Sequence, residues 1–374
     1  MISRPARLKG LSAAFALSLA LAGCSSLGTG SVTDLPAPDD AQFGTGAMKV
    51  GMLVEDQADE LSSGAPNSTF LAAQLNAQTV AKAPITLIVR HYDGTPEGLK
   101  AAEQLLSGQG VSLVIGPDDA VVSLGLASEL GRKGVPIMSL GSASDAKTNL
   151  YAFAMDGETE ASLMADEMRR RLYRQVVLVS NPNGSERIFT SQLASSIAKI
   201  NVGLVSVDGA DPAAAAKRIT AIVAGGQIPS AIVFAQSAKS AAAVMTELRR
   251  NPKLAGVPVV GVSSWSFEAT AAASAGPGWY LAPEGNSISD FSARFLKAFN
   301  ALPTPDGALA YDLIVMAAAL PQAVPGQSPY AREVLANEQG FKGVTGKFWF
   351  TQDGQVHRNL LPVDIAPGLA RPAT

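Results

Sequence analysis

The chain has 374 residues, of which 47% are hydrophobic and 16% are charged, so its bulk is not a charge-rich disordered polymer. With 29 basic and 32 acidic residues the net charge is −3, which leaves no basic excess to neutralise nucleic-acid phosphates. A single cysteine excludes an internal disulfide, and one cysteine with two histidines argues against a zinc site. No cofactor is expected.

The N-terminal segment is typical of an exported lipoprotein. Three basic residues precede the apolar run Leu11–Leu21, which is too short to span a bilayer. The next residues, Leu21-Ala22-Gly23-Cys24, resemble the lipobox of bacterial lipoproteins, in which the cysteine is acylated. We therefore expect a signal peptide over residues 1–23, a lipid on Cys24 and a flexible tether over residues 24–46. An ordinary signal peptide with a chance cysteine is the alternative.

From Met48 onward, apolar runs alternate with helical patterns. Strands are expected at 48–54, 85–89, 113–115, 136–138, 176–179, 204–207, 231–234 and 257–262. Helices are expected near 70–77, from 96, and near 121–130, 188–200, 212–223 and 238–248. Thr95-Pro96, for example, supplies a helix cap and a first-turn proline before Leu99, Ala102 and Leu106 at helical spacing. Apolar strands separated by helices are typical of parallel sheets covered on both faces.

The C-terminal part of the chain departs from this alternation. Two consecutive helices are predicted, around Phe291–Phe299 and over Ala308–Leu320. Gly346–Thr351 and Leu360–Ile365 flank Asp353-Gly354, which predicts a hairpin with a tight turn. About eight strand–helix units exceed one sheet of ordinary size, so two lobes are expected.

No motif in the sequence predicts an enzyme. Neither a Gly-x-Ser-x-Gly elbow nor a phosphate-binding Gly-x-x-x-x-Gly-Lys-Ser/Thr loop occurs. The first strand is followed by Glu55-Asp56 rather than a glycine-rich turn, which disfavours a dinucleotide site. His91 and His357 are expected at loops or strand ends on the surface. Asp118-Asp119 is either a carboxylate pair for acid–base or metal chemistry or, as we favour, a helix cap.

Four segments, taken together and in this order, resemble type I periplasmic binding proteins, and the branched-chain amino-acid binding proteins in particular. They are Ala102–Leu106 with Val111–Pro117, Gly134–Ser139, Ala310–Asp312, and Phe341–Gly346 with Phe350–Gly354. The resemblance implies an α/β fold of two lobes, each a doubly wound parallel sheet, joined by three crossovers. It implies residues 47–154 plus 282–328 for the first lobe, 155–281 plus 329–366 for the second, and a tail over 367–374.

In open α/β sheets, ligands bind outside the carboxyl ends of the strands. The candidate contacts at those ends are Asp118, Asp119, Ala120, Ser139, Gly141, Ser142, Ser144, Ser185, Ser237, Ser263 and Trp265. Serine hydroxyls suit a neutral polar ligand, whereas the two aspartates would favour a cation. Trp265 is predicted either to stack on the ligand or to be a buried packing residue.

The resemblance also indicates which ligand groups lack a partner. Family members that bind amino acids hold the carboxylate with a hydroxyl at a helix start, which aligns near Ala120. Their Ala-x-Thr segment and a second-lobe acid hold the ammonium group, and these align with Gly141–Ala143 and near Ser263. Because both halves of this pattern are missing, we expect typical leucine-like amino acids to bind poorly.

The sequence is compatible with two functions. One is a lipid-anchored solute receptor that delivers a small molecule to an ABC permease. The other is a regulatory envelope lipoprotein similar to the activators of penicillin-binding proteins, with a protein partner such as a cell-wall synthase. For both we expect a periplasmic location and a membrane anchor. The outer membrane is favoured by Ser25 after the lipobox cysteine.

Overall fold

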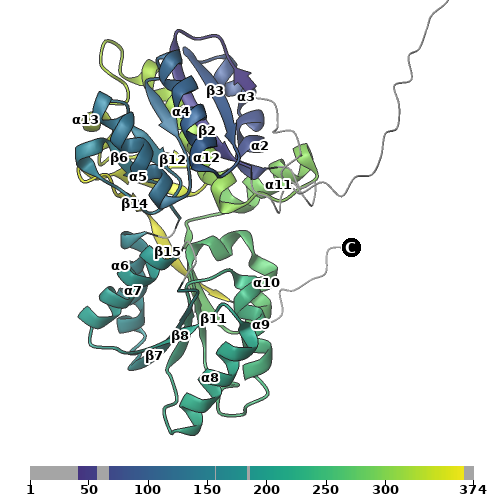
Figure 1. Cartoon of the computed structure of the whole chain (residues 1–374). Helices are drawn as coiled ribbons and strands as arrows, with labels where there is room; N and C mark the ends of the chain where they lie inside the picture. The colour runs from purple at the N-terminus through teal and green to yellow at the C-terminus, as the bar shows by residue number, and fades with distance from the viewer. Residues whose placement is uncertain (1–40, 57–66, 156, 183–185, 366–374) are drawn as a thin grey trace, which may run out of the picture. The chain divides into compact units, whose positions relative to one another are not determined.

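The computed structural model describes residues 41–56, 67–155, 157–182 and 186–365 (Figure 1). Its strands form two sheets of six strands and one of three, in an α/β arrangement. Cys24, the signal peptide and most of the expected tether lie outside the described residues, as do Ser185 and the C-terminal tail.

The first sheet has the order β1-β3-β2-β4-β5-β6. Its strands are β1 (Ala41–Phe43), β2 (Met48–Glu55), β3 (Ile85–Tyr92), β4 (Leu113–Ile115), β5 (Ile137–Ser139) and β6 (Leu150–Ala152). Strands β2 to β6 pair in parallel, as the sequence predicts, whereas β1 pairs antiparallel with β3. The tether assignment is therefore wrong for Ala41–Phe43, whose backbone hydrogen-bonds to the edge of the sheet.

Helices cover both faces of this sheet because its central strands are apolar on both sides. They are α2 (Ser68–Leu75), α3 (Ala77–Ala81), α4 (Pro96–Gln109), α5 (Ala120–Glu129), α11 (Ser287–Phe299), α12 (Pro305–Ala323) and α13 (Arg332–Leu335), with the short 3-10 helices η2 (Gly131–Lys133) and η3 (Ala146–Thr148). Val50 and Met52 of β2 pack in one cluster with α12, α2 and α3. Leu53 and Val114 face the opposite cluster with α4 and α5. Each fully buried aliphatic side chain of this kind contributes about 1.5–3 kcal/mol.

The second sheet has the order β15-β11-β10-β9-β7-β8. Its strands are β7 (Gln175–Ser180), β8 (Gly203–Asp208), β9 (Ala231–Phe234), β10 (Val259–Gly261), β11 (Gly278–Pro283) and β15 (Leu360–Ile365). Its helices are α6 (Glu158–Arg170), α7 (Arg187–Lys199), α8 (Pro212–Ala224), α9 (Ala238–Leu248), α10 (Ala269–Ala275) and the 3-10 helix η4 (Ser263–Phe267). Only β15 is antiparallel, against β11. The chain thus passes between the two sheets three times: after β6, after β11 and before β15.

A small antiparallel sheet of β12 (Phe341–Gly343), β13 (Gly346–Phe350) and β14 (Val356–Arg358) packs on the first sheet's core. The Phe348 ring lies 4.6 Å from that of Phe153, and Phe350 lies 5.4 Å from Tyr151. This packing differs from the predicted boundary, which placed residues 329–366 in the second lobe. The predicted hairpin partner was also wrong: β13 pairs with β14, and Leu360–Ile365 joins the second sheet.

A buried carboxylate fixes this small sheet to α12. Asp312 is 3% exposed and accepts hydrogen bonds from the Val344 N–H (2.7 Å), the Thr345 N–H (2.9 Å) and the Thr345 hydroxyl (2.6 Å). Arg358 of β14, also buried, donates to Thr345 and to the carbonyl groups of Phe153 and Ala154. Because buried polar groups need such partners, this network specifies where β12–β14 dock.

Candidate functional site

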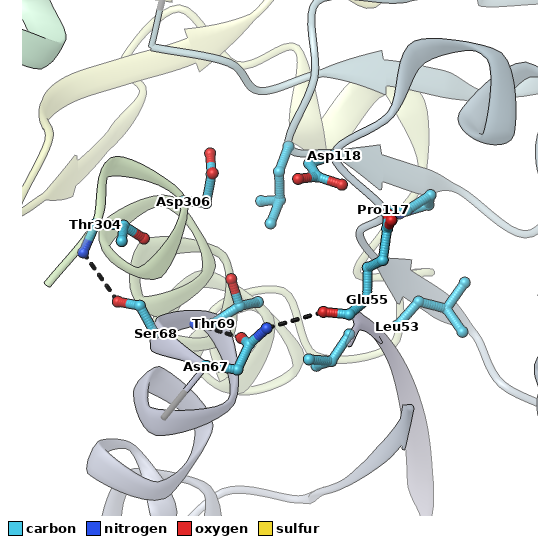
Figure 2. Close-up of a pocket in the computed structure, with 11 residues that line it drawn as sticks. Leu53, Glu55, Asn67, Ser68, Thr69, Pro117, Asp118, Thr304 and Asp306 are labelled. Atoms are coloured by element: carbon cyan, nitrogen blue, oxygen red, sulfur yellow. Dashed lines mark hydrogen bonds between the residues drawn. The ribbon is translucent and has the colours of Figure 1, made fainter. Parts of the chain in front are cut away.

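A polar hollow of about 110 Å³ lies at the carboxyl ends of the first sheet's strands. Figure 2 shows its walls, which come from the end of β2, the residues after β4 and β5, and the first turns of α2 and α12. Its lining residues are Leu53, Val54, Glu55, Asn67, Ser68, Thr69, Pro117, Asp118, Leu140, Thr304 and Asp306. This edge of an open α/β sheet is where ligands bind.

Two capped helix starts hold the walls of the hollow together. The Asn67 side chain accepts from the Thr69 and Phe70 N–H groups, and its amide donates to the Glu55 carbonyl at 2.9 Å (Figure 2). The Thr304 N–H donates to the Ser68 hydroxyl at 2.9 Å. Hydrogen bonds therefore join the start of α2 both to the end of β2 and to the start of α12, and they hold these three ends in one arrangement.

Three carboxylates, those of Glu55, Asp118 and Asp306, line this hollow. Burial raises the pKa of Glu55, an effect to which Asp118 and Asp119 add, although a hydrogen bond from the Tyr92 hydroxyl (2.9 Å) opposes it. Burial also raises the pKa of Asp118, and the neighbouring Asp119 adds to that rise. Negative charge here disfavours a ligand carboxylate and favours hydrogen-bond donors or a cation.

The aspartate pair has two different roles. Asp119 accepts from the Val121 and Val122 N–H groups at 2.8 Å each, so it caps α5 as predicted. Asp118 lines the hollow instead. Among the described residues, no group of three His, Cys, Asp or Glu side chains is placed to hold a metal ion.

We expect Asp118→Asn to stabilise the protein at neutral pH. A carboxyl group whose pKa is raised on folding contributes most stability below its ordinary value of 3.8, and that contribution is lost as the pH rises towards the folded-state pKa. The variant should therefore melt at a higher temperature than the wild type at pH 7. That difference should vanish at pH values below 3.8.

Asp119→Asn is the matched control, because asparagine caps a helix equally well. A lower melting temperature of Asp118→Asn at pH 7 would contradict this account.

Several predicted contacts are occupied within the protein. The Ser139 hydroxyl is fully buried, lies 2.7 Å from that of Ser123 and donates to the Pro117 carbonyl at 3.2 Å. At the second sheet, Ser263 is fully buried and donates from its N–H and its hydroxyl to Glu160, which is 2% exposed. Both serines thus have strong partners without a ligand. Glu160 is an acidic group next to Ser263 that the sequence did not indicate.

Trp265 is likewise a packing residue in this structure. It is 0% exposed, and its indole N–H donates to the Gln236 carbonyl at 2.7 Å. Its ring lies 6.3 Å from those of Phe234 and Tyr280. Of the two predicted roles, burial therefore holds here.

The remaining candidates lie at the expected strand ends. Gly141 is where the Asp118 carbonyl approaches so closely that a Cβ atom would lie 2.1 Å from it. Ser237 caps α9 by accepting from the Ser240 N–H. Ser144 accepts from the Gln355 amide at 2.7 Å. Ala120 is the first residue of α5, and Ser142 is half-buried.

His91 lies at the end of β3, as predicted, but the prediction that it is a surface residue was wrong. Its side chain is 2% exposed, and its Nδ1 lies 2.7 Å from the Asp56 carboxylate. Phe70 of α2 packs edge-on against its ring at 5.1 Å. His357, on β14, is half-buried and stacks on Trp349.

The α2 and α12 residues of the hollow were not predicted from the sequence. A signal for them exists, because Asn67-Ser68 and Thr304-Pro305 have the composition of helix starts. The adjacency of these two starts depends on the tertiary fold and is not a property of either segment alone. A second hollow, of about 480 Å³, lies beside Leu320, Val334 and Phe341, but its walls do not include strand carboxyl ends.

Comparison with protein families agrees with this architecture. Residues 47–368 match the family model described as periplasmic binding protein. The chain belongs to the periplasmic binding protein family. Among curated proteins, the sequence comparison finds no match. None of the helices within the described residues combines the length and apolar character needed to cross a membrane.

Solved structures show the same fold as this periplasmic binding protein at low sequence identity. The Streptococcus pneumoniae branched-chain amino acid substrate-binding protein LivJ, in complex with isoleucine, has 17% identity and a TM-score of 0.59, and the match covers 85% of this chain and 99% of that one. A Rhodopseudomonas palustris BisB5 solute-binding protein, in complex with 3,4-dihydroxybenzoic acid, has 14% identity and a TM-score of 0.64, with 84% and 92% covered. An R. palustris protein in complex with benzoate has 15% identity and a TM-score of 0.63, with 86% and 94% covered. The resemblance predicted from the sequence, and the two-sheet α/β fold, are thereby confirmed.

Proposed function

We propose that this protein is a periplasmic solute receptor of the ABC-importer type, anchored through Cys24, and that its hollow binds a small polar solute without a carboxylate group. The observation that carries the ligand class is the set of three carboxylates, Glu55, Asp118 and Asp306, around one hollow. The structural neighbours were solved with isoleucine, benzoate and 3,4-dihydroxybenzoic acid, all of which carry a carboxylate. Such a group would meet like charge here.

A small-molecule screen by thermal shift and calorimetry tests this proposal. We expect leucine and benzoate to leave the melting temperature unchanged, and an uncharged polyol, a sugar or a polyamine to raise it. A ligand present at about 100 times its dissociation constant stabilises the folded state by about 2.7 kcal/mol, which is readily measured. Asp306→Asn should alter the affinity for the identified solute, whereas the same change at exposed Asp353 should not. Micromolar binding of leucine or benzoate would overturn the ligand class.

The second candidate function is a regulatory lipoprotein that keeps this fold and binds a protein. It is favoured by the internal partners of Ser139 and Ser263, which leave two predicted ligand donors occupied. Genes for a permease and an ATPase beside this gene would support the importer role. Neighbouring cell-wall genes, together with a screen that finds no ligand, would support the regulatory one.

A further inference from the structure

An exposed leucine in an unfavourable backbone conformation ends α6. Leu172 has φ +59° and is 82% exposed. The Leu172 N–H donates to the Arg169 carbonyl and the Tyr173 N–H to the Met168 carbonyl, each at 3.0 Å, which is the bond pattern of a Schellman helix end. The left-handed position of that motif normally holds glycine. A large apolar side chain is therefore presented to solvent at a site where folding alone favours glycine.

Basic residues surround this leucine. Arg169, Arg170, Arg171 and Arg174 make up four of the six residues from 169 to 174. The nearby carboxylates are engaged by these and adjacent cations: Asp166 pairs with Arg169, Glu167 with Arg170 and Arg171, Asp364 with Arg171, and Glu247 with Arg250. Within the described residues, Arg174 and the exposed Lys253 have no ion-pair partner. A positive excess remains, although the whole chain carries −3.

The fold brings a second exposed apolar side chain to the same edge of the second sheet. Strands β10, β9 and β7 are neighbours and parallel, so the loops that precede them lie along one end of the second sheet. Lys253 lies in the loop before β10, and Ile228 lies in the loop before β9. Leu172 and Arg174 lie in the loop before β7. Ile228 is 53% exposed, and the nearby Ser230 hydroxyl accepts from the Arg174 N–H at 3.1 Å. We call this set, with Arg169 and Arg170, the basic edge. It lies at the amino ends of the second sheet's strands, and it shares no residue with the lining of the polar hollow.

We propose that the basic edge binds the surface of an anionic phospholipid bilayer. Cations near such a surface are attracted to its headgroups, and apolar side chains beside them enter the interface. Leu172 and Ile228 supply the apolar contacts, and Arg174 and Lys253 supply charge that no carboxylate in the described residues neutralises. The contact would turn the amino ends of the second sheet's strands towards the membrane, independently of what the hollow binds.

Co-sedimentation with vesicles of phosphatidylcholine, with and without phosphatidylglycerol, tests the proposal. The mature chain from residue 24 is used with Cys24→Ala in every arm, so that neither an acyl chain nor the predicted signal peptide contributes. We expect Arg174→Gln with Lys253→Gln to weaken binding to the anionic vesicles about tenfold or more, and added salt to weaken wild-type binding. Arg132→Gln with Lys133→Gln, an equal charge change at exposed residues beside the first sheet, should have an effect within about twofold.

Leu172→Gly separates this role from folding. Glycine suits the left-handed position, so the variant should melt at the same or a higher temperature while its binding to the anionic vesicles falls several-fold. Equal binding to vesicles with and without phosphatidylglycerol would overturn the proposal. So would equal losses in the Arg174/Lys253 and Arg132/Lys133 variants, or binding to an acidic protein with none to vesicles.

Discussion

Replacing Asp312 with alanine is expected to lower the free energy of unfolding by about 3–5 kcal/mol. The change leaves three backbone and side-chain donors without their acceptor, and it removes the negative charge near the buried Arg358 guanidinium. The Val344 N–H and both donors of Thr345 bond to this carboxylate. Arg358, 4% exposed, would then lie beside Thr345 without the negative charge that stabilises it. Denaturant titration of the variant and the wild type measures the difference.

Two further variants show whether the loss comes from this network. Asp312→Asn retains one acceptor oxygen and fills the space, so its loss should be smaller than that of Asp312→Ala. Asp166→Ala removes an exposed ion pair with Arg169 on α6 and should change stability by no more than ~0.5 kcal/mol. If Asp312→Ala were as mild as Asp166→Ala, the small sheet would have to be held by its aromatic packing alone.

The sequence predicted those features of the fold that depend on local pattern. Apolar runs such as Val176–Val179 predicted strands, and Thr95-Pro96 predicted the start of α4; both are confirmed. Pairing across the chain was harder to predict. Leu360–Ile365 has the pattern of a hairpin strand, but it bonds to β11, about eighty residues earlier. Nothing in its own composition distinguishes these two partners.

The candidate site shows the same division. The cap at Asp119 follows from its position before an apolar helix, and it was predicted. Burial was one of the two roles predicted for Trp265, but it was not predicted for Ser139 or Ser263. A serine at a strand end has the same sequence context whether its hydroxyl faces solvent or a buried partner. Their partners, Ser123, Glu160 and Gln236, are between 16 and 103 residues away in the chain. A carboxylate such as Glu160 becomes a neighbour of Ser263 only after the second sheet has formed.

Trp265→Ala is expected to lower the free energy of unfolding by about 3–5 kcal/mol, the usual cost of removing a fully buried aromatic side chain. The indole packs directly against the backbone of Gly261. Residue 261 is glycine because a Cβ atom there would lie 2.2 Å from the Trp265 ring. Loss of the indole N–H would also leave the Gln236 carbonyl without its hydrogen-bond donor.

Trp265→Phe separates packing from ligand contact. Phenylalanine fills most of the same space but cannot donate to Gln236, so the expected loss is about 1–2 kcal/mol. Since the indole has no exposed surface, the same variant should bind any identified solute with an affinity within about twofold of the wild type. Trp349→Phe, at a half-buried position on β13, is the control for both measurements. A stable Trp265→Phe variant that had lost its ligand would mean that the second sheet opens in solution to present this ring, which the bond to Gln236 argues against.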